Sequence, residues 1–189
     1  MPKGNEKLLK RKRVIVFAYE GKNNKTESQY FSHFVSYDSD YIIKAFPSGV
    51  TDPKNMISTV KRKRSRYDYH SNEDLTFLFI DGDCDTKKLE LVKRLQAKLP
   101  KDITIVLSNP CFELWFLNHF VSIGKEFLNN DEFFKELDKH IANYDKNKDY
   151  FQMLSSNTKT AIKNSNIQKT NSCSSCTDVV NLFNNKIIK

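Results

Sequence analysis

The 189-residue sequence has few glycines and prolines, with five of each. This scarcity excludes collagen-like and low-complexity chains and favours a folded domain with ordinary loops. No apolar run approaches the ~18 residues that a membrane span needs. The charged opening MPKGNEKLLKRKR also lacks the apolar segment of a secretory signal. We therefore expect a cytoplasmic protein without a membrane partner.

Cysteines are equally sparse, and the four are scattered as Cys84, Cys111, Cys173 and Cys176. A chain of this length with so few cysteines does not have a disulfide framework, and reduced thiols are the simpler interpretation. Cys173 and Cys176 have the spacing of half a zinc site, but no second pair accompanies them. The sequence also lacks a glycine-rich phosphate loop, so we expect no ATPase activity of its own.

Positive charge is abundant, and the net charge is +8. The excess is bunched in one run, Lys10 to Arg13, and in a second run that comprises Lys61, Arg62, Lys63, Arg64 and Arg66. Clustered lysines and arginines suit a polyanion, because each neutralised phosphate releases counterions. Nucleic acid is therefore the expected partner, although short basic runs can also be solvated, solubilising faces.

Hydrophobic patterning predicts an α/β fold with a mostly parallel four-stranded sheet flanked by helices and a helical C-terminal extension. Short β-branched and aromatic runs predict strands at 14–19, 41–46, 75–80 and 103–108. Helical spacing predicts helices from Thr26, from Pro53 to about Arg66, after Thr86, and at 110–120, 131–143, 155–167 and 177–187. Loops are expected at 143–149 and 164–176. We divide the chain into a basic arm at 1–12, a catalytic domain at 13–120 and an extension at 121–189.

Acidic residues follow two of the predicted strands. Glu20 follows the first strand, and Asp81 and Asp83 flank Gly82 after the third. Because functional groups gather at the carboxyl ends of parallel strands, these side chains are expected to meet. Three carboxylates form a hard oxygen site suited to Mg²⁺ or Mn²⁺. Taken alone, Asp-Gly-Asp can equally be a plain turn.

The order strand, Glu-Gly, helix, strand, helix, strand, Asp-x-Asp resembles the Toprim domain of topoisomerases, primases and OLD-type nucleases. Three segments are more closely similar to the RloB-like proteins of bacterial phage defence: EGKNNKTESQYF at 20–31, DGDCD at 81–85 and LSNPCFELWFLNHF at 107–120. These proteins are relatives of the second protein of the AbiL abortive-infection pair. The resemblance covers roughly residues 12 to 150, with a weaker similarity at 177–183.

The resemblance to Toprim enzymes implies roles for the acidic residues. Glu20 would be a metal ligand or a general acid or base, and Asp81 and Asp83 would bind Mg²⁺. Asp85 would be a secondary ligand. By similarity to OLD-type nucleases, Glu113 and Lys146 would complete the site, with the nearby Lys148 as the alternative lysine.

The resemblance therefore implies a Toprim-like fold and a Mg²⁺-dependent nuclease that cleaves DNA or RNA in antiviral defence, beside a separately encoded ATPase. Lys22 and Lys25 would hold the flanking phosphates, with Lys146 offsetting charge at the reacting phosphate. A non-catalytic module that binds nucleic acid or a partner is the alternative, and nucleotidyl transfer, as in primases, is a third interpretation. A free nuclease would harm its host, so we expect the isolated protein to be weakly active.

Overall fold

The computed structural model describes residues 11–22, 25–34, 40–170 and 175–188. Several predictions therefore fall outside the described residues, namely those on the arm up to residue 10, on Cys173 and on the side chain of Lys25. None of the helices in the described ranges has the length and apolarity that a membrane span requires.

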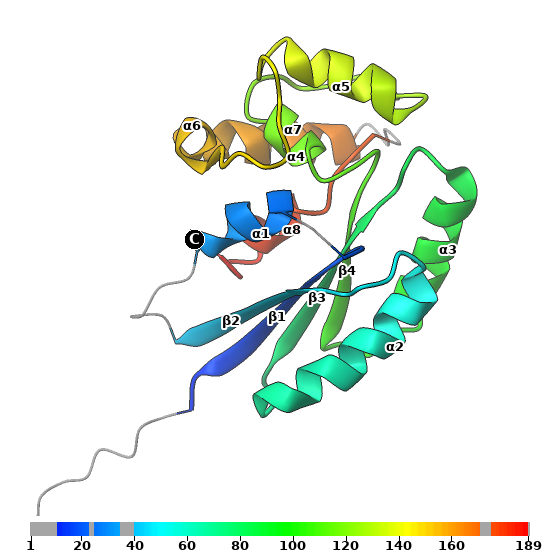
Figure 1. The fold of residues 1–189 in the computed structure, drawn as a ribbon, viewed down its shortest axis with the longest axis vertical. Coiled ribbons are helices and arrows are strands. Elements are labelled where there is room, and N and C mark those ends of the chain that lie inside the picture. Colours follow the sequence, from blue (N-terminus) through cyan, green and yellow to red (C-terminus); the bar gives the residue numbers. More distant parts are fainter. Residues whose placement is uncertain (1–10, 23–24, 35–39, 171–174, 189) are drawn as a thin grey trace, which may run out of the picture.

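The described residues form a parallel four-stranded sheet in the order β2-β1-β3-β4 (Figure 1). The strands are β1 (Arg13–Tyr19), β2 (Tyr41–Pro47), β3 (Leu75–Asp81) and β4 (Ile103–Ser108). The α/β fold expected from the sequence is confirmed, because each predicted strand coincides with an observed one.

Helices cover both faces of the sheet, as Figure 1 shows. They are α1 (Lys25–Ser32), α2 (Pro53–Arg64), the short 3₁₀ helix η1 (Ser65–Tyr67), α3 (Thr86–Gln96), α4 (Leu114–Leu117), α5 (Asn130–Asp138), α6 (Phe151–Ser155), α7 (Thr158–Thr170) and α8 (Val180–Asn184). α2 and α3 lie on one face, while α1 and α8 lie on the other.

The central strand β1 is buried on both faces, which explains its continuous apolar sequence. Its alternate residues point to opposite sides of the sheet. Val16 belongs to the apolar cluster beneath α2 and α3. Phe17 points the other way and packs edge-on against Phe31 of α1, with ring centroids 5.0 Å apart. The second cluster continues from α1 into the C-terminal helices, as far as Ile188.

Some helices differ from the sequence-based expectation. The segment 110–120 is buried as expected, but only α4 is regular helix, because the preceding residues form part of the site described below. α5 is shorter than predicted, because it ends at Asp138 with Lys139 as its C-cap and the residues up to Asn143 form turns. The helix predicted at 155–167 is divided into α6 and α7. α7 extends to Thr170, so the loop predicted from 164 was wrong over those residues.

The strand order places a topological switch point beside β1. From β1 the chain crosses through α1 to β2 on one side, and it then returns through α2 to β3 on the other. In open α/β sheets such a point creates a crevice at the carboxyl ends of the diverging strands. The candidate site lies at the carboxyl ends of β1 and β3.

Candidate metal and active site

Glu20 and Asp81 lie side by side at this edge, as predicted. Glu20 follows β1, and its backbone N–H donates to the carbonyl of Phe79 in the neighbouring strand at 3.1 Å. The N–H of Asp81 donates to Glu20 Oε2, also at 3.1 Å. Gly21 has a φ of 79°, a conformation that is cheap for glycine and turns the chain away from the sheet. Register and turn together bring two residues 61 positions apart into contact.

Asp81 is the centre of a group of carboxylates. Its Oδ1 accepts a hydrogen bond from the N–H of Phe112 at 2.9 Å, which ties the segment before α4 to β3. Burial raises the pKa of Asp81 well above its usual range, and the nearby carboxylates of Glu27, Glu113 and Glu20 raise it further. In the absence of a cation, these charges repel one another.

Asp83 is held toward the same site by an unusual backbone. Asp83 and Cys84 both have left-handed conformations, with φ of 54° and 56°. Each costs on the order of 1 kcal/mol for a residue with a side chain. The N–H of Asp83 donates to the carbonyl of Pro110 at 2.8 Å, and the N–H of Cys84 donates to Asn109 Oδ1 at 2.9 Å. Backbone strain compensated by hydrogen bonds is typical of functional loops.

Lys88 of α3 lies between two of the acidic side chains. Its Nζ donates to Glu20 Oε1 at 2.9 Å and to Asp83 Oδ2 at 2.7 Å. Burial alone would lower the pKa of Lys88, but its bonds to the two carboxylates outweigh this and raise it. The pKa of Glu20 is raised by burial despite this partner. The ammonium group thus stands where a cation bound by Glu20 and Asp83 would lie.

Asp85 has a clear structural task. It is the N-cap of α3, and its Oδ1 accepts from the N–H groups of Lys87 at 2.8 Å and Lys88 at 3.3 Å. Its predicted role as a secondary ligand stays a prediction, and the cap accounts for this aspartate without a metal.

Glu113 and Lys146 meet, as the resemblance implied. Glu113 is only 3% exposed, and its Oε1 accepts hydrogen bonds from Tyr144 at 2.9 Å and from Thr26 at 3.3 Å. Lys146 Nζ lies 3.7 Å from the same oxygen, while its side chain stays 60% exposed. Burial raises the pKa of Tyr144, and the charge of Glu113 raises it further, so the phenol remains a donor.

Glu27 belongs to this group but was not predicted as a site residue. It lies in the first turn of α1 and is 7% exposed. Burial raises its pKa from the ordinary 4.5 to about 7, and the charge of Glu113 adds to the effect. The sequence held one usable signal. A helix that follows a parallel strand begins at the carboxyl edge, so an acidic residue in its first turn faces the same crevice.

The donor set suits a hard divalent cation, although a cation would have to rearrange it. Within the described residues, the carboxylates whose charges raise the pKa of Asp81 are those of Glu20, Glu27, Asp83 and Glu113. Carboxylate oxygens are the preferred ligands of Mg²⁺ and Mn²⁺. Across the described ranges, no three histidine, cysteine or acidic side chains already converge as a ready ligand group. A cation would have to draw the oxygens together and displace the Lys88 ammonium.

The predicted nucleic-acid-binding residues are divided between two places. Lys22 is exposed in the turn that follows Glu20. Lys61 to Arg64 form the last turn of α2, whose first turn borders the site. Arg64 bonds to Thr76 at the start of β3, at the opposite edge of the sheet. Lys63 donates to the carbonyls of Pro47 and Ser48 and Arg64 pairs with Asp102, so both already have protein partners.

Lys61 and Arg62 are more exposed, but they lie at the far end of the helix from the carboxylates. The structure therefore brings together the acidic residues and Lys146, and it does not bring the α2 basic run beside them.

Two hollows open beside the carboxylates. One, of about 530 Å³, is lined by Glu20, Asp83 and Lys88 together with the first residues of α2. The other, of about 680 Å³, lies between α5 and the loop that carries Tyr144 and Lys146. The first hollow exposes Glu20 and Asp83 directly, whereas the second reaches the acidic group only through Tyr144 and Lys146, which contact the buried Glu113.

Comparison with known proteins gives a single result. The model of the RloB-like protein family matches residues 15–185. Searches of curated proteins and of solved structures gave no match. The matched span includes β1 from Ile15 onward, the other three strands and all the acidic residues of the site. The chain therefore belongs to the RloB-like protein family.

Proposed function

We propose that this RloB-like chain is a Mg²⁺- or Mn²⁺-dependent nuclease that hydrolyses phosphodiester bonds in DNA or RNA. The observation that carries the proposal is the cluster of carboxylates around Asp81 in β3. Other members lie just after β1, in α1 and in the segment before α4, and their negative charges raise the pKa of Asp81. Burying so many like charges is costly unless protons or cations neutralise them. A cation-dependent reaction would explain why these carboxylates are buried together. The resemblance to Toprim enzymes supports the same reaction.

The residues divide into two roles. Glu20, Asp81 and Asp83 would hold the cation, and Glu27 extends this oxygen set on the α1 side. When bound, the cation would polarise the phosphodiester, activate water and stabilise the leaving oxygen. The chain itself supplies Lys146, whose mobile ammonium group can approach a phosphate oxygen and offset its developing charge. Glu113 holds Lys146 and Tyr144 at the edge of the site.

A cleavage assay tests this proposal. Labelled plasmid, single-stranded DNA and tRNA are incubated with Mg²⁺ or Mn²⁺ and with wild-type protein, Glu20→Gln or Asp81→Asn. We expect cleavage by the wild type and at least a 100-fold loss in both variants. Glu90→Gln, which removes an exposed carboxylate elsewhere on α3, is the matched control and should cleave normally.

The assay is repeated in phage-infected cells that also carry the separately encoded ATPase implied by the resemblance, because we expect the isolated protein to be weakly active. The nuclease proposal fails if nothing is cleaved under any of these conditions, or if both site variants cleave as well as wild type.

One observation favours a second function, a non-catalytic binding module. Lys88 already pairs with Glu20 and Asp83, so part of the acidic charge is balanced without a metal. Thermal unfolding with and without Mg²⁺ separates the two functions. The nuclease needs a stabilisation by Mg²⁺ that Asp81→Asn removes. A module whose charges are balanced internally should show the same melting temperature in both conditions.

A further inference from the structure

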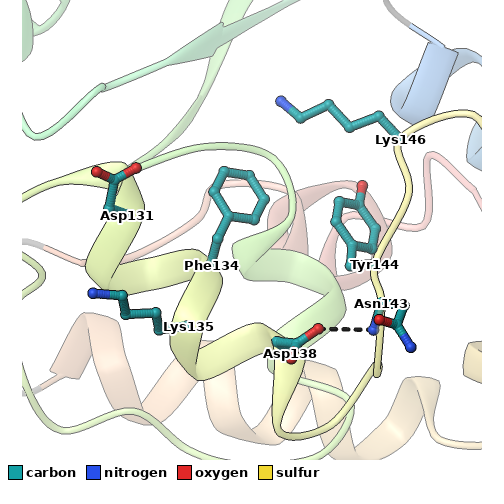
Figure 2. A pocket seen from close by; sticks show the side chains of 7 residues that line it. All are labelled: Asp131, Phe134, Lys135, Asp138, Asn143, Tyr144 and Lys146. Carbon is teal, nitrogen blue, oxygen red and sulfur yellow. Dashed lines mark hydrogen bonds between the residues drawn. The ribbon is translucent and has the colours of Figure 1, made fainter.

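The larger hollow beside the site has features that neither the metal nor the acidic residues explain. Its volume of about 680 Å³ lies in the range of small-molecule sites. Figure 2 shows Phe134 and Lys135 on α5 and Tyr144 and Lys146 on the following loop, and the carboxylates of Asp131 and Asp138 complete the lining, so that aromatic, cationic and acidic groups border the hollow.

Two aromatic rings form one wall. The rings of Phe134 and Tyr144 are nearly parallel, with an interplanar angle of 17° and centroids 6.0 Å apart. Both residues are half-buried. Tyr144 is held in place by its bond to Glu113 and by stacking on Tyr150. Lys146 Nζ lies 5.3 Å from the centroid of the Phe134 ring. A wall of fixed aromatic rings beside a lysine suits a planar base that carries a phosphate.

Polar groups around this wall have hydrogen-bonding capacity to spare. Asn143 donates its backbone N–H to Asp138 Oδ1 at 2.7 Å, which fixes its left-handed conformation (dashed in Figure 2). Its side-chain carboxamide makes no hydrogen bond to any described residue, and within the same ranges Lys135 makes no ion pair. A carboxamide can donate to and accept from the edge of one base. A lysine can hold a phosphate.

The hollow is connected to the carboxylates through two of the residues that line it. Tyr144 and Lys146 line the hollow, and both contact Glu113. The charge of Glu113 in turn raises the pKa of Asp81. Lys146 therefore lies between the acidic group and the ring of Phe134, where it can contact a phosphate that joins the two places. The ring wall, the carboxamide and the lysines are all recognition groups for a nucleotide.

We propose that this hollow binds the base and sugar of the nucleotide adjoining the reacting phosphate. Phe134 supplies the stacking surface and Asn143 contacts the edge of the base. Lys135 and Lys146 hold the phosphates on either side. The inference rests on the proposed function for the position of the reacting phosphate, but binding of a nucleotide can be measured without catalysis.

The test is an NMR titration of ¹⁵N-labelled protein with adenosine 5′-monophosphate in EDTA. We expect shift changes at the backbone amides of residues 131–146. Ribose 5-phosphate, which has the sugar and phosphate without the base, should bind about tenfold more weakly, because the stacking contribution is lost. Phe134→Leu should also weaken nucleotide binding about tenfold. Asn143→Gly keeps the left-handed backbone and should weaken it severalfold. Ile167→Ala, at a partly exposed site on α7, should bind as wild type.

Three results would overturn the inference. One is the absence of shifts in 131–146 at millimolar nucleotide. Another is equal binding of ribose 5-phosphate, which would mean that only phosphate is recognised. The third is wild-type affinity in both Phe134→Leu and Asn143→Gly, each checked by its spectrum for a folded state. Nucleotide binding without any cleavage would reject the nuclease proposal alone, and cleavage without this binding would reject the nucleotide site alone.

Discussion

Replacing Glu27 by glutamine should stabilise the metal-free protein at alkaline pH. Glu27 is 7% exposed, and its pKa rises from 4.5 to about 7 on folding. A carboxyl group with a raised pKa binds more protons in the folded state than in the unfolded state between these values. The free energy of unfolding therefore falls as pH rises through this window. At about 1.36 kcal/mol per pKa unit, the loss approaches 3 kcal/mol above pH 7. Asp81 shares the same repulsion, so we expect a gain of about 1 to 3 kcal/mol in Glu27→Gln.

The measurement is urea unfolding of wild type and Glu27→Gln in EDTA at pH 5 and pH 8. At pH 5 the wild-type carboxyl group is mostly protonated, so the two proteins should differ little. At pH 8 the variant should be the more stable. Glu90→Gln serves as the control, because its exposed carboxylate should give the same small difference at both pH values. A variant that is less stable than wild type at pH 8, or a difference that does not grow with pH, would refute the reasoning.

Adding Mg²⁺ should reduce the stability advantage of Glu27→Gln at pH 8. A cation bound by wild type stabilises it by RT ln(1 + [L]/Kd), about 2.7 kcal/mol at 100 times Kd. Glu27→Gln replaces a charged carboxylate by a neutral carboxamide, so Mg²⁺ should stabilise the variant less than wild type. If Mg²⁺ stabilises both proteins equally, Glu27 does not act on the cation.

Three other substitutions test separate parts of the site. Lys88→Met removes the ammonium that occupies the acidic crevice, so it should lower metal-free stability while increasing the melting-temperature shift that Mg²⁺ produces; an unchanged shift would mean that lysine and cation do not compete. Asp85→Ala removes the N-cap of α3 and should lower the free energy of unfolding by about 1 kcal/mol, as should the matched Asp52→Ala at α2. Both variants should keep the melting-temperature shift that Mg²⁺ produces, and loss of that shift in Asp85→Ala alone would show that Asp85 is also a ligand. Gly82→Ala should destabilise the protein by about 1 to 3 kcal/mol in chemical unfolding, because its new Cβ would lie 2.5 Å from Asn109 Oδ1, and a neutral effect would show that this approach is not tight.

The sheet could be predicted because its central strands β1 and β3 are buried on both faces. Residues such as Val14 to Tyr19 then form continuous apolar runs that no surface helix would have, and the intervening helices make a parallel arrangement the natural one. The C-terminal helices were less predictable. Segment 110–120 is apolar all round because it is buried, but burial does not specify how many residues are helical. Hydrogen bonding of Phe112 to Asp81 decides that, and it is a tertiary contact.

The residues of the site also differ in how far the sequence could predict them. Glu20 and Asp81 were predictable because each lies at the carboxyl end of a strand, and strand ends have a fixed place in a parallel sheet. Glu27 looked like an ordinary helix-start residue, since its burial depends on packing between α1 and the segment before α4. The basic run on α2 was easy to see in the sequence, but clustered charge does not indicate where the cluster lies in the fold. The run lies far from the site because it forms the last turn of α2, whereas the first turn borders the site.

The balance of charge around Asp81 gives the strongest reason to expect a cation. Among the described residues, the ammonium groups near this cluster are those of Lys88 and Lys146, and Lys146 is largely exposed to solvent. They leave an excess of negative charge, which together with burial raises the pKa of both Glu27 and Asp81. Protons and Mg²⁺ should therefore compete, and the stabilisation by Mg²⁺ should increase from pH 6 to pH 8. A purely structural cluster, with its proton retained at pH 8, would show no such coupling.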